Sequence, residues 1–69
     1  MQIQVNGEQR EVSDGLSLSE LITQLKLRAD QVAIELNQEV LRRAAWAATN
    51  LHPGDRVEIV QFVGGGVVS

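Results

Sequence analysis

Cysteine is absent from this 69-residue sequence, and histidine, proline and tryptophan each occur once. Without cysteine the chain can form neither a disulfide framework nor a thiolate, so its apolar core alone must stabilise it. A lone histidine, His52, cannot assemble a metal site without further ligands, and we expect none. A chain this short forms one domain with little room for an enclosed active site, which argues against an enzyme.

Long apolar runs and basic clusters are also missing. No apolar run approaches the roughly 20 residues that span a membrane. The first residues lack the basic-then-apolar layout of a signal peptide, so a cytoplasmic location is expected. Six basic against nine acidic residues give a net charge of −3, and no basic cluster exceeds the pair Arg42 and Arg43. This charge disfavours nucleic acid and suits docking on a basic patch of another protein.

The beginning of the chain has the pattern of a β-hairpin. Ile3 and Val5 alternate with glutamines, which predicts a half-buried strand over residues 2–6. Asn6-Gly7 follows, the dipeptide best suited to the positive φ angles of a type I′ turn. A weaker second strand is predicted over residues 8–13.

A helix is predicted to begin after the break that follows this hairpin. Ser17 and Glu20 have the spacing of a capping box, in which each side chain accepts a hydrogen bond from the other residue's backbone. The following apolar residues recur at helical spacing and form one stripe, made of Leu18, Leu21, Ile22 and Leu25.

The second half of the sequence alternates short strands with turns. Strands are predicted over 32–36, 39–41 and 56–63, and a short helical turn over 44–48 contains Trp46 as a core anchor. One amphipathic helix is the only layer available to cover the strands. The sequence therefore predicts the α+β class and a β-grasp (ubiquitin-like) fold, in which a mixed sheet of four to five strands packs on one main helix.

Three consecutive glycines, Gly64, Gly65 and Gly66, follow the last predicted strand. They bury no side chain and lose the most backbone entropy on ordering, so they have no use in packing. They are either a frayed end or a segment that enters a narrow channel in a partner. We predict a folded domain over residues 1–63 and a flexible tail over 64–69, whose glycines reach roughly 10 Å when extended.

Val60 and Phe62 are expected on the face of the last strand opposite Val57 and Ile59. If Val57 and Ile59 enter the core, the other two side chains face solvent. A large apolar side chain exposed beside the tail indicates a partner-docking patch, with local packing as the alternative.

Residues 57–66 resemble the end of the ThiS family, the sulfur carriers of thiamine biosynthesis. The same family is matched by residues 1–7, by the strand and turn at 34–40, by Arg43 with Trp46 just beyond, and by the turn at 53–55. The resemblance therefore extends over essentially the whole chain. Two glycines alone would be weak evidence for the family, but glycines in this position after these elements are specific evidence.

The resemblance implies a role for Gly66. An ATP-dependent activating enzyme would adenylate its carboxylate, and sulfur from a donor such as a cysteine desulfurase would convert the adenylate to a thiocarboxylate. Thiazole synthase would then receive the sulfur. The nucleotide and metal belong to the activating enzyme, so the resemblance implies a cosubstrate that has no cofactor of its own.

Two features depart from the family. Val67-Val68-Ser69 follow the glycines, so Gly66 has no carboxylate until they are removed; removal by a peptidase is favoured over an unnatural extension or a different way of working. The chain reads Val40-Leu41-Arg42-Arg43 where the family often has Val-Val-Pro-Arg, with a proline before the arginine. The alternatives are a β-grasp carrier of another pathway, for molybdopterin, cysteine or another sulfur metabolite, and a ubiquitin-like interaction module.

Overall fold

The computed structural model describes residues 1–63 together with Gly66 and Val67. Its elements, in chain order, are β1 (Gln2–Val5), β2 (Glu8–Glu11), α1 (Leu18–Gln24), the 3-10 helix η1 (Ala29–Gln31), β3 (Val32–Leu36), β4 (Glu39–Leu41), the 3-10 helix η2 (Arg43–Ala48), β5 (Arg56–Val63) and β6 (Gly66–Val67). None of the helices in these described ranges is long and apolar enough to cross a membrane.

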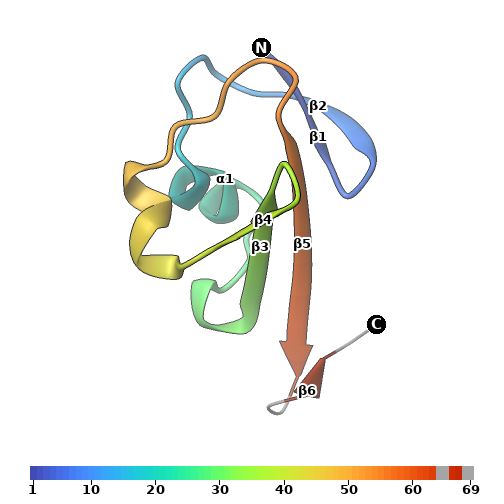
Figure 1. Ribbon diagram of the computed structural model, residues 1–69, viewed down its shortest axis with the longest axis vertical. Helices are drawn as coiled ribbons and strands as arrows, with labels where there is room; N and C mark the ends of the chain where they lie inside the picture. Colours follow the sequence, from blue (N-terminus) through green and yellow to red (C-terminus); the bar gives the residue numbers. More distant parts are fainter. Residues whose placement is uncertain (64–65, 68–69) are drawn as a thin grey trace.

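The strands form a mixed sheet in the order β2-β1-β5-β3-β4, and β6 pairs with the end of β5. β1 and β5 run parallel, whereas all the other pairs are antiparallel. α1 lies against one face of this sheet, with η2 next to it (Figure 1). The predicted mixed sheet on one main helix is confirmed.

The core lies between the sheet and α1. It contains the inward residues of the strands, the apolar stripe of α1 and the ring of Trp46, whose Nε1 donates to the carbonyl oxygen of Leu41 at 3.1 Å. Because an indole needs a partner for its N–H when buried, this bond completes the anchor that the sequence predicts. The buried apolar residues are Ile3, Val12, Leu16, Leu18, Leu21, Ile22, Val32, Ile34, Trp46, Leu51 and Val57.

The start of α1 is the predicted capping box. The Ser17 hydroxyl accepts from the Glu20 backbone N–H at 3.1 Å, and the Glu20 carboxylate accepts from the Ser17 N–H at 3.0 Å. The backbone hydrogen bond from Ser17, and then its side chain, hold the pKa of Glu20 below its usual value. These two bonds satisfy backbone donors that have no partner within the helix, which allows a helix of only seven residues to begin sharply.

Both hairpin turns of the sheet use positive φ angles. Asn6 and Gly7 have φ angles of 50° and 82°, as the type I′ prediction requires. Asn37 and Gln38 have φ angles of 51° and 71°, so the second hairpin uses the same geometry without a glycine. Asparagine tolerates this region because its short side chain can hydrogen-bond locally.

Several details differ from the sequence predictions. β2 ends at Glu11 rather than at residue 13, and η1 and β6 were not predicted; β1 and η2 also differ from their predicted bounds by one residue each, at Val5 and Arg43. A single 3-10 turn and a two-residue strand contain too few residues to show a period. Gly64, Gly65, Val68 and Ser69 lie outside the described residues, so the flexible tail over 64–69 stays a prediction.

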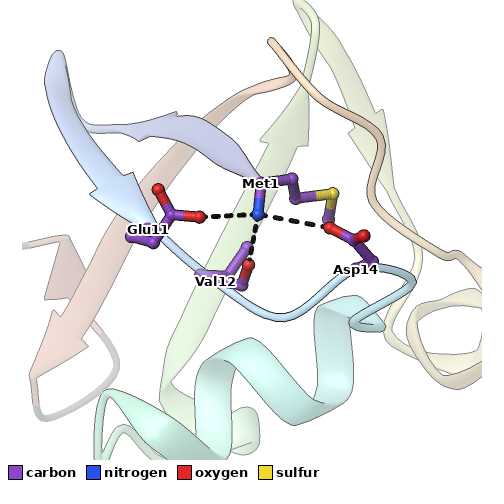
Figure 2. A network of polar contacts seen from close by, with 4 residues as sticks. All are labelled: Met1, Glu11, Val12 and Asp14. Carbon is purple, nitrogen blue, oxygen red and sulfur yellow. Dashed lines mark hydrogen bonds and ion pairs between the residues drawn. The ribbon is translucent and has the colours of Figure 1, made fainter.

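The α-amino group of Met1 anchors the first strand (Figure 2). It donates to Glu11 Oε2 at 2.7 Å and to the carbonyl oxygen of Val12 at 2.7 Å, and it lies 3.2 Å from Asp14 Oδ1. An ammonium group has three protons, and these three acceptors match them. The hydrogen bond to Glu11 is the main reason why the pKa of the α-amino group lies above its usual value of 8.0.

This network predicts a specific loss of stability in alkali. A raised pKa means that the folded state holds this proton more tightly than the unfolded chain, so the stabilisation is complete below pH 8 and is lost as the pH rises through the folded-state pKa. The chain has neither tyrosine nor cysteine to titrate in this range. We expect the denaturant midpoint to fall as the pH rises above the usual α-amino pKa of 8.0.

The double variant Glu11→Gln, Asp14→Asn is the control for this measurement. It removes both acidic partners of the α-amino group and should flatten the pH dependence of the midpoint. An equally steep fall in wild type and variant would contradict the assignment.

Candidate functional site

The candidate site begins at the central strand β5, which leads into the glycines. Residues Arg56 and Val57 pair with β1, and residues 57–61 pair with β3, ending at the pair of Val32 with Gln61. Phe62 and Val63 continue beyond both neighbours and pair only with β6 within the described residues. The end of β5 therefore projects from the body along the long axis of the molecule (Figure 1).

Two turn asparagines hold β5 from opposite sides. Asn6 accepts the backbone N–H of Ile59 on its Oδ1 at 2.7 Å, and Asn37 accepts that of Arg56 at 2.9 Å. The Asn37 side chain also donates to Asp55 Oδ1 at 3.1 Å. The same residues that form the positive-φ turns thus hold the strand that carries the tail, a role that the sequence analysis missed because it joins residues up to 53 positions apart.

β5 divides its side chains between two faces. Val57 is 1% exposed, and Ile59 is half-buried against the core. Val60 is 39% exposed and Phe62 is half-buried on the other face, which we call the outer face of the sheet. The predicted division of faces is confirmed. The docking role of Val60 and Phe62 stays a prediction.

Gly66 and Val67 form β6, which pairs with the end of β5. Gly66 lies opposite Val63, and Val67 lies opposite Phe62, in antiparallel pairing. Gly64 and Gly65 lie outside the described residues. An isolated two-stranded hairpin is at best marginally stable in water, so this pairing can open at low cost. The pairing involves only the projecting end of β5, and it does not bind Gly66 to the core.

A hollow of about 730 Å³ lies beside the later half of β5, at the ends of β1, β2 and α1. Apolar side chains from the rim of the core line it, including Val5, Leu25, Leu27 and Ile59. Glu8 and Arg10 are the charged residues that line it within the described part of the chain, and neither is a nucleophile with a neighbouring base. This hollow, which the sequence did not predict, offers apolar contact rather than acid–base chemistry.

His52 belongs to the turn before β5. Its backbone N–H donates to Asp55 Oδ2 at 2.8 Å, and its Nδ1 lies 3.8 Å from the same oxygen. Among residues 1–63, 66 and 67, no three histidine or acidic side chains gather as a metal site would require. The hydrogen bond from the His52 N–H to Asp55 closes the turn that precedes β5.

Comparison with known proteins adds independent information. A family model described as the ThiS family matches residues 3–66. The chain is 32% identical to the sulfur carrier protein ThiS of Escherichia coli K12 over 66 residues, which cover 96% of this chain and all of that protein. It is 35% identical over 66 residues to a thiazole synthase of Paramagnetospirillum magneticum, but it spans only 20% of that protein's length.

A solved structure agrees with these sequence relationships. The crystal structure of a thiamine biosynthesis protein (ThiS) from Geobacter metallireducens matches with a TM-score of 0.83 and 43% identity. The match covers 96% of this chain and all of that one. The fold and the sequence therefore identify the same group of proteins.

The two faces of β5 predict opposite responses to the same substitution. Val57→Ala removes two methyl groups from the core and should lower the free energy of unfolding by about 2 kcal/mol. Val60→Ala, matched in chemistry and three residues away, should lower it by less than about 1 kcal/mol. Urea denaturation measures both values, and equal losses would contradict the assignment of Val60 to the outer face.

Proposed function

The chain belongs to the ThiS family, and we propose that it carries sulfur as a thiocarboxylate on Gly66 for thiazole formation in thiamine biosynthesis. The observation that carries this proposal is the family match, which extends from residue 3 to Gly66, the last glycine of the run. The fold supports it, because β5 directs the chain that contains this glycine away from the core.

The chemistry begins with the bond between Gly66 and Val67. Water adds across this peptide bond, leaving a carboxylate on Gly66 and a free amino group on Val67. The core lies within residues 3–57, with Ile59 packed against it, so we expect the chain that ends at Gly66 to remain folded. This cleavage also removes the residue that pairs with Phe62, which opens the hairpin.

Activation then requires a better leaving group than the carboxylate oxygen. In the proposal, the Gly66 carboxylate attacks the α-phosphorus of ATP on the activating enzyme and releases pyrophosphate. The persulfide sulfur of a donor such as a cysteine desulfurase attacks the acyl carbon, and AMP leaves with one of the original carboxylate oxygens. A thiol reductant then cleaves the resulting S–S bond and leaves the thiocarboxylate on Gly66. Gly64 and Gly65 suit the channel leading to that site, because a backbone without Cβ atoms can be approached closely.

Thiazole synthase is the proposed recipient of the sulfur. The thiazole synthase of P. magneticum matches this chain over a fifth of its own length, so a carrier-like segment and a synthase share one polypeptide there. That arrangement supports a carrier and a synthase that work in contact. In this proposal the chain is a cosubstrate of both enzymes, and the catalytic groups belong to the enzymes.

Intact mass measures the proposed chemistry directly. The chain ending at Gly66, mixed with the adenylating enzyme, ATP, a sulfur donor and a thiol reductant, should gain the mass that results when one oxygen is replaced by sulfur. Gly66→Ala in the same chain should be charged about 100-fold more slowly, because a methyl group displaces the carboxylate in a closely fitting channel.

The controls for this experiment are the full chain and circular dichroism of the variant. The full chain should keep its mass, because Gly66 is then part of a peptide bond, and Gly66→Ala should keep the wild-type spectrum. No mass change in the chain ending at Gly66 would overturn the proposed function.

Phe62→Ala tests the docking role of the projecting end of β5. The substitution removes a half-buried ring outside the core and should raise the KM for the carrier in pyrophosphate release about tenfold. The midpoint of thermal unfolding should change little. Gln24→Ala, on the exposed side of α1, is the matched control and should change neither value. A large fall in the unfolding temperature of Phe62→Ala would show a packing role instead.

A further inference from the structure

The outer face of the sheet carries two glutamates directly opposite one another. Glu35 of β3 pairs with Glu58 of β5, and the next pair toward the tail on the same face is Ala33 with Val60. Side chains opposite each other on neighbouring strands have Cβ atoms about 4.5–5.5 Å apart. α1 covers the other face of the sheet, where Ile34 and Ile59 pair.

This arrangement places two negative charges side by side on the outer face of the sheet. Like charges directly opposite each other destabilise a sheet. Within the described residues, the ion pairs involve Met1, Arg28 with Asp30, and His52 with Asp55, and none includes Glu35 or Glu58. A positive charge from outside the chain would turn this repulsion into attraction.

Exposed apolar groups border the two carboxylates. Val40 of β4 lies opposite Glu35 and is 71% exposed, and Val60, beyond Glu58 along β5, is 39% exposed. They are the large apolar side chains that the described part of the chain leaves most exposed. Val60 in turn leads to Phe62 and the glycines. The two carboxylates and the exposed valines therefore form one surface, which continues into the glycine segment that is proposed to enter a partner.

We propose that Glu35 and Glu58, together with Val40 and Val60, form a docking surface for a basic side chain, most favourably an arginine, on the activating enzyme. This inference rests on the proposed function and adds the chemistry by which the partner recognises the body of the carrier. A planar guanidinium has five donors and can bind two carboxylates at once. Its apolar stem would lie over the valines.

Docking and chemistry would use different parts of the molecule. Gly66 provides the reacting atoms, whereas the carboxylates lie on a rigid sheet several residues before the tail. Complementary charge mainly increases the rate of encounter and fixes the orientation of a complex. Loss of the carboxylates should therefore raise the KM for the carrier and leave kcat unchanged.

The experiment measures pyrophosphate release by the adenylating enzyme with chains ending at Gly66. The double variant Glu35→Gln, Glu58→Gln should raise the KM about tenfold at low salt, with kcat unchanged, and the difference should shrink as salt rises from about 50 to about 500 mM. Its denaturant midpoint should equal or exceed that of wild type, because a repulsion has been removed.

The matched control is the double variant Glu8→Gln, Glu39→Gln. It makes the same change in net charge, but these exposed residues pair with Val5 and Leu36, whose side chains lie on the core side of the sheet. Its KM should stay within about twofold of the wild-type value. Equal effects of the two double variants would show that only net charge matters and would overturn the surface.

The remaining outcomes separate the surface from the proposed function. If the enzyme turns over the wild-type chain and the Glu35→Gln, Glu58→Gln variant has the same KM, the surface alone is overturned. A lower denaturant midpoint in that variant would make the carboxylates structural and would also overturn the surface. No pyrophosphate release from the wild-type chain would overturn the proposed function, and the surface with it.

Discussion

The pairing of β5 with neighbours on both sides is the constraint on which the rest of the structure depends. β1 joins it in parallel and β3 in antiparallel, and the side chains of Asn6 and Asn37 extend these ladders by one backbone hydrogen bond each. A parallel pair cannot be closed by a short turn, so the helix, β3 and β4 all lie in the connection between β1 and β5. That one long crossover contains α1, which covers the core of this short chain.

The side chains of β5 alternate between two faces, so one strand contributes both to the core and to the proposed docking surface. The inward residues, Val57 and Ile59, bind the sheet to the helix. The outward residues, Glu58 and Val60, lie opposite Glu35 and Ala33 of β3 on the face of the sheet away from α1. In a small domain almost every inward position is needed for the core, so function must use the outer face and the ends of the strands.

In the proposed function, the glycines and the outer face of the sheet contribute in different ways. A run of glycines loses packing energy and allows close approach to another protein's backbone. The proposed surface would place Glu35 and Glu58 against a cation of the partner. Features that add little to an isolated chain but favour a complex are what we expect of a protein that works by being bound.

Local patterns in the sequence determined most of the elements of this protein. The bounds of β5, the capping box of Ser17 and Glu20, the turn at Asn6-Gly7 and the buried face of α1 all follow from short-range spacing and backbone preference. Only the tertiary structure decided which distant residues meet: Asn6 with Ile59, the α-amino group of Met1 with Asp14, and Glu35 with Glu58. Spacing along a chain reports the face of a residue on its own element, whereas strand order and register set its neighbours, and these depend on how the whole core packs.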